Sequence, residues 1–76
     1  MKKFKNNSNK YICPQNRLSI KIHPNERVKF IGYRYFASGV YDNVLIQSID
    51  DMAEYSYGVP ILEITRKDWQ KFVPIG

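Results

Sequence analysis

The sequence predicts an all-β or mostly β protein, a small antiparallel barrel of four or five strands with one short helical turn. Short apolar or alternating segments rich in Val, Ile and Tyr are separated by turn-forming residues, a pattern typical of strands. Helical periodicity is scarce outside one turn near the carboxyl end. A chain of 76 residues also has room for a single domain with a small core.

The first ten residues differ from the rest of the chain. Residues 1–10 hold one large apolar residue, Phe4, among lysines and asparagines. Such a segment contributes little to a core, so it predicts a flexible basic arm that is dispensable for folding. The single small β domain is then expected over residues 11–76.

The next segments predict a short apolar patch, a strand and then a turn. Tyr11–Cys13 is a brief apolar patch ended by Pro14, and Leu18–Ile22 alternates apolar and polar residues like a half-buried strand. His23–Glu26 contains Pro and Asn in the order that favours a turn.

A long hairpin is expected in the middle of the chain. Arg27–Phe36 and Val40–Ile49 have strand composition, and Ala37–Gly39 separates them. Gly32 lies within the first of these strands, where an isolated glycine indicates a β-bulge or a sharp bend.

The carboxyl-terminal part predicts a strand, a helical turn and a last short strand. Val59–Ile64 has strand composition, and Thr65 is a suitable N-cap for a turn through Asp68. Trp69 and Phe72 are three residues apart, so both can pack against the sheet. Val73–Ile75 is expected to form a last short strand or a packed tail.

This order of elements, with a brief turn before the last strand, resembles an SH3-like barrel over residues 18–75. The resemblance is one of shape. Because small barrels of this kind have unrelated functions, it implies no particular activity.

Positive charge is concentrated at the amino end. The first 25 residues carry six basic residues and no acidic one, whereas the remainder has six basic and seven acidic residues. The net charge of +5 therefore comes from the amino-terminal third. Such asymmetry is typical either of a solubilising tail or of a protein whose partner is a phosphate backbone, an anionic membrane surface or an acidic protein.

Catalytic and metal-binding patterns are scarce, so we expect no enzyme, no cofactor and no metal. One Cys and one His are too few for a zinc site, and the glycines are too far apart for a phosphate loop. The carboxylates of Asp50, Asp51 and Glu54 are typical of a solvated turn.

No long apolar segment follows the initial lysines, which argues against a signal peptide and a membrane span. One Cys cannot form an internal disulfide. The expected location is the cytoplasm, which is the host cytoplasm if a phage encodes the protein.

A candidate binding surface follows the strand that begins at Arg27. Regular alternation would place basic and tyrosine side chains together on the face opposite Val28 and Phe30, whereas a bulge at Gly32 would reverse Tyr33 and Tyr35. Tyrosines suit docking to proteins, and rings beside cations suit single-stranded nucleic acids. The candidate residues are Arg27, Lys29, Tyr33, Tyr35, Tyr41, Tyr55 and Tyr57.

Three functional hypotheses follow. The first is a non-enzymatic protein-binding module, a small phage- or mobile-element-encoded regulator or inhibitor of a host protein. The alternative is a protein that binds RNA or single-stranded DNA through the basic arm and the Tyr/Lys/Arg stripe. The second alternative is a structural subunit of a larger assembly, joined by sheet-edge pairing. Self-association is left open.

Overall fold

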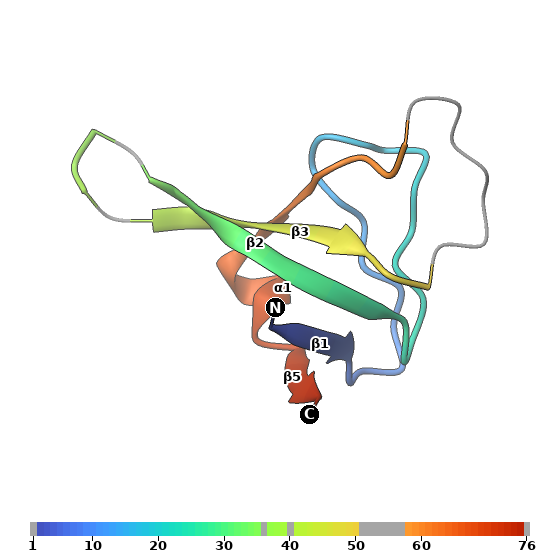
Figure 1. Ribbon diagram of the computed structural model, residues 1–76. Coiled ribbons are helices and arrows are strands. Elements are labelled where there is room, and N and C mark those ends of the chain that lie inside the picture. Colours follow the sequence, from blue (N-terminus) through green and yellow to red (C-terminus); the bar gives the residue numbers. More distant parts are fainter. Residues whose placement is uncertain (1, 36, 40, 51–57, 76) are drawn as a thin grey trace.

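The computed structural model describes residues 2–35, 37–39, 41–50 and 58–75. It is mostly β, as predicted: five antiparallel strands form one sheet in the order β4-β3-β2-β1-β5, with one short helix (Figure 1). The elements are β1 (Lys3–Asn6), β2 (Arg27–Tyr35), β3 (Tyr41–Ser48), β4 (Leu62–Thr65), α1 (Arg66–Trp69) and β5 (Phe72–Ile75).

The sheet does not close into a barrel, which corrects the predicted architecture. Strands β4 and β5 are its two edges, and no ladder joins them within the described segments. The β1–β2 loop covers the edge of β4: the Gln15 N–H donates to the Glu63 carbonyl at 2.8 Å. The Asn16 side chain donates to the Ile61 carbonyl and accepts from the Glu63 N–H, both at 2.9 Å. The loop thus occupies the backbone groups that barrel closure would use.

Strand β1 lies between β2 and β5, so the prediction of a flexible arm is wrong for Lys3–Asn6. Phe4 is opposite Val28 on one side and Pro74 on the other. Its ring packs against that of Trp69, with centroids 4.6 Å apart. The alternation of apolar and basic residues in β1 explains its place in the sheet, because Phe4 and Asn6 face the core while Lys3 and Lys5 face away from it.

Asn6 fastens the β1–β2 loop to the sheet. Its side chain is fully buried, and its amide nitrogen donates to the carbonyls of Lys10 at 2.9 Å and His23 at 3.2 Å. Its side-chain oxygen accepts from the backbone N–H and the hydroxyl of Ser8, at 3.1 and 2.7 Å. A single polar side chain therefore holds both ends of the loop.

The loop ends in the predicted turn at His23–Glu26. The Glu26 N–H donates to the His23 carbonyl at 3.1 Å, and Asn25 has a φ of 66°. Pro24 followed by a left-handed Asn is the sequence that a type II turn favours.

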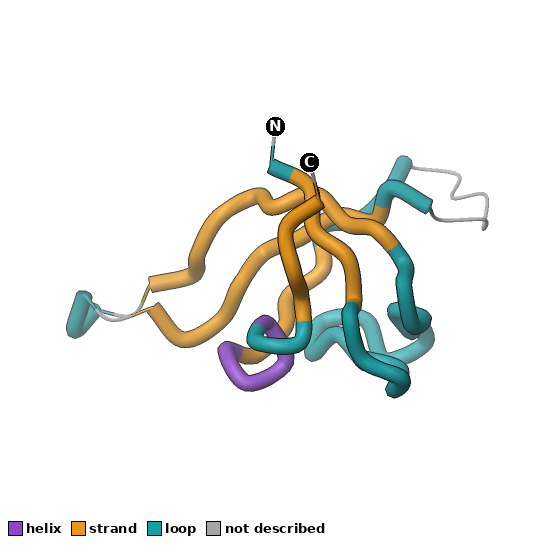
Figure 2. Tube along the Cα trace, turned by 90° about the horizontal axis from the view of Figure 1, so that it is seen from below, coloured by secondary structure: helices purple, strands orange, loops and turns teal. Residues whose placement is uncertain are grey.

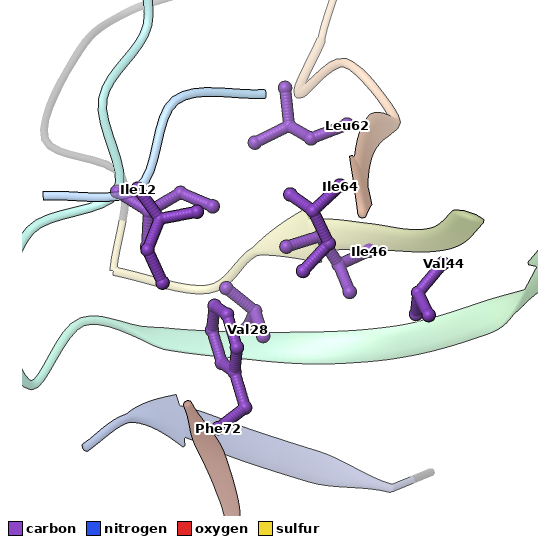
Figure 3. Close-up of a cluster of buried hydrophobic side chains, with 8 residues drawn as sticks. Ile12, Val28, Val44, Ile46, Leu62, Ile64 and Phe72 are labelled. Atoms are coloured by element: carbon purple, nitrogen blue, oxygen red, sulfur yellow. The ribbon is translucent and has the colours of Figure 1, made fainter. Parts of the chain in front are cut away.

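The rest of the loop differs from the predicted strand at Leu18–Ile22. One isolated bridge joins Ile12 to Ile22, whereas Leu18 is 82% exposed. Ile12 is instead buried against the sheet (Figure 3), and Ile22 is buried in the same core. The buried core consists of Ile12, Ile22, Val28, Val44, Ile46, Leu62, Ile64 and Phe72.

The two faces of the sheet are covered unequally. Helix α1 and the β1–β2 loop lie on the face that carries the core, called the inner face below (Figure 2). The opposite side of the sheet is called the outer face.

The predicted cap of α1 is confirmed, since the Asp68 N–H donates to Thr65 Oγ1 at 3.1 Å.

Candidate binding surface

A β-bulge at Ile31 determines which way the candidate residues face. Phe30 is opposite Ile46 and Gly32 is opposite Leu45, which leaves Ile31 as the extra residue. The bulge expected from Gly32 is therefore confirmed. Because one extra residue reverses the facing of every side chain that follows it, the predicted stripe is divided between the two faces.

The tyrosines of β2 lie on the inner face. Tyr33 is opposite the buried Val44, and the rings of Tyr33 and Tyr35 are in contact, with centroids 6.2 Å apart. Tyr41 pairs with Tyr35 at the start of β3. The two remaining candidates, Tyr55 and Tyr57, lie outside the described residues.

These tyrosines continue a row of packed rings that starts at the core, called the aromatic row below. Ring centroids are 5.3 Å apart between Phe72 and Trp69 and 5.7 Å between Trp69 and Phe30. The row continues from Phe30 to Tyr33 at 5.1 Å and ends at Tyr35. The sequence predicts that Trp69 packs against the sheet, but its spacing from the tyrosines carries no signal that connects them.

Exposure rises along the aromatic row. Phe72 is 7% exposed, Tyr33 39% and Tyr35 61%. The exposed end lies on the β2–β3 hairpin, which extends beyond the part of β2 paired with β1 (Figure 1). The aromatic row thus ends in two exposed rings, Tyr33 and Tyr35, which continue from the packed rings of Phe30 and Trp69.

The cations of β1 and β2 lie on the outer face. Lys3 is opposite Lys29 and Lys5 is opposite Arg27. Arg27 is engaged by Asp50: its guanidinium lies 2.6 Å from one carboxylate oxygen, and its backbone N–H donates to the other at 2.9 Å. Hydrogen bonding from Arg27 lowers the pKa of Asp50, and the same contact raises the pKa of Arg27.

Three lysines of this face have no acidic partner among the residues that the structure describes. They are Lys3, Lys5 and Lys29, called the lysine cluster below. Farther along β2, Arg34 is paired with Glu63 at 3.2 Å. Lys3 and Lys29 border a shallow hollow of about 400 Å³, which Gln47 and Val59 also line.

Of the three neighbouring carboxylates expected in a solvated turn, Asp50 contacts Arg27. Asp51 and Glu54 lie outside the described residues. The described residues contain no group of three potential metal ligands and no helix with the length and hydropathy of a membrane span. Comparison with protein-family models, curated proteins and solved structures finds no match for this chain.

Proposed function

We propose that the protein is a non-enzymatic binding module that docks a partner protein through the exposed end of the aromatic row. The observation that carries this proposal is the bulge at Ile31, which aligns Tyr33 and Tyr35 with the packed rings of Phe30 and Trp69. Tyrosine buries a large ring while its hydroxyl keeps a polar contact, so it is enriched among interface hot spots.

The packing of the row favours tight docking. Tyr33 rests against Phe30, so its ring loses less conformational freedom on binding than a ring on an unsupported side chain would. A regulator or inhibitor of a host protein, encoded by a phage or mobile element, is the form of the proposal that we favour, since inhibition requires only docking. Two further features support an open SH3-like arrangement: the order of the strands in the sheet, and the short helix α1 that connects β4 to β5 along the chain.

The two alternatives have less support in the geometry. Binding of single-stranded nucleic acid was expected to use rings beside cations, but Tyr33 and Lys29 face opposite sides of the sheet. Assembly by edge pairing is disfavoured at both edges of the sheet. The Asn16 side chain covers the β4 edge, and Pro74 in β5 has no N–H to donate to a neighbouring strand.

Capture of the partner tests this proposal. Tagged protein is incubated with nuclease-treated lysate of the cells that produce it, and the captured protein is then titrated. We expect Tyr33→Ala and Tyr35→Ala to weaken binding by about 2 kcal/mol or more each, roughly thirtyfold in Kd.

Tyr11→Ala is the matched control. Tyr11 is 57% exposed on the β1–β2 loop, where its ring contacts His23 and not the aromatic row. The Tyr11→Ala variant should therefore bind the partner with the same Kd as the unmodified protein. Equal losses in all three variants, or a partner that is captured from untreated lysate but not from nuclease-treated lysate, would contradict docking by the aromatic row.

A further inference from the structure

The lysine cluster places like charges in register on the outer face. Lys3 and Lys29 occupy directly opposed positions of β1 and β2, and Lys5 is the next outward residue of β1. Like charges directly opposite one another destabilise a sheet. No acidic side chain offsets them in the described segments, whereas Arg27 and Arg34 each have a carboxylate partner.

We propose that the lysine cluster binds the phosphate backbone of a nucleic-acid duplex. This surface is separate from the aromatic row, because the two lie on opposite faces of the sheet. A polyanion placed across β1 and β2 would remove the repulsion between Lys3 and Lys29 and release its own counterions.

The type of cation favours phosphate over carboxylate. Arginine is the residue that recognises carboxylates with two parallel hydrogen bonds, whereas lysine acts as a point charge and is a common phosphate ligand. The arginine opposite Lys5, Arg27, already forms such a contact with Asp50: its Nε donates to Oδ2 at 2.9 Å and its Nη2 to Oδ1 at 2.6 Å. The cations left for a ligand on these paired strand segments are therefore lysines.

The surroundings of the cluster favour a duplex over a single strand. Recognition of unpaired bases relies on rings for stacking, and the outward neighbours of the cluster on β5 are Val73 and Ile75. Side chains on one face of a strand repeat about every 6.8 Å, which lets Lys3 and Lys5 reach successive phosphates of one chain. The hollow beside Lys3 and Lys29 leaves space for that chain.

The expected binding is weak, independent of sequence and strongly salt-dependent. Non-specific affinities of this kind correspond to a Kd of about 10⁻⁴ to 10⁻⁶ M at physiological salt. Three lysine–phosphate contacts predict a slope of about −2.7 for the logarithm of affinity against the logarithm of salt concentration.

Fluorescence anisotropy with a labelled DNA duplex of mixed sequence, measured over a range of salt concentrations, tests the proposal. The test variant is Lys3→Gln/Lys5→Gln/Lys29→Gln. The control variant is Lys10→Gln/Arg17→Gln/Lys21→Gln, which removes the same charge from exposed positions of the β1–β2 loop. We expect at least a tenfold loss and a salt slope near zero for the test variant only.

Two additional measurements make the outcome decisive. Lys29→Glu places an acid opposite Lys3, so it should keep the strand pairing and still weaken binding if the triple variant fails to fold. Equal losses in test and control variants would show that net charge alone attracts the duplex. Tighter binding of a polyglutamate peptide, or of a single strand, than of the duplex at the same salt concentration would also overturn the proposal.

Discussion

Replacement of Asn6 by alanine is expected to lower the free energy of unfolding by about 3 kcal/mol. The change removes the hydrogen-bond partner of the Lys10 and His23 carbonyls and of the Ser8 N–H and hydroxyl. Each buried polar group that is left unsatisfied costs about 1–3 kcal/mol. Urea unfolding followed by circular dichroism measures the effect.

Two further variants separate hydrogen bonding from side-chain volume. Asn6→Asp keeps the shape but removes the amide donors, so it should destabilise the protein at neutral pH as well. Asn7→Ala alters an exposed neighbour whose backbone N–H donates to the Lys71 carbonyl, a bond that alanine preserves. Stability of Asn6→Ala within about 0.5 kcal/mol of the unmodified protein, a typical surface effect, would contradict this role.

A chain that starts at Lys10 is expected to lose cooperative unfolding altogether. The deletion removes β1, which pairs with both β2 and β5, and it removes the Phe4 ring that packs on Trp69. Phe4 is half-buried against the core, so its ring contributes part of the about 3–5 kcal/mol that a fully buried Phe side chain is worth. Together with the loss of both strand pairings, this cost is comparable with the whole stability of many small domains.

Differential scanning calorimetry measures this loss directly. Lys3→Gln/Lys5→Gln serves as the control, because it removes charge from the same strand and keeps Phe4 and Asn6 in place. A truncated chain that still melts cooperatively within a few degrees of the full chain would show that residues 1–9 are a dispensable arm.

Local sequence signals predicted several features correctly. Thr65 was recognised as an N-cap because its hydroxyl can accept a backbone N–H, and the Asp68 N–H donates to it. Gly32 indicated the bulge in β2. The sequence could not locate the extra residue, and a shift of one position decides which face Tyr33 occupies.

Features that depend on distant residues were not predictable in the same way. β1 has one large apolar residue, and its inward place depends on Trp69 and β5 at the other end of the chain. The sheet stays open, and the Asn16 side chain covers the β4 edge by bonding to the backbone of Ile61 and Glu63. Nothing in local composition distinguishes that asparagine from one in a solvated loop.

The proposal that the tyrosines dock a protein depends on the face that Tyr33 occupies, and NOE spectroscopy measures that face directly. The structure predicts cross-peaks from the Tyr33 ring to the methyl groups of Val44 and to the ring of Phe30. Cross-peaks from the Tyr33 ring to the side chains of Lys29 and Gln47 would instead place the tyrosine among the cations of the outer face and contradict the division of the two surfaces.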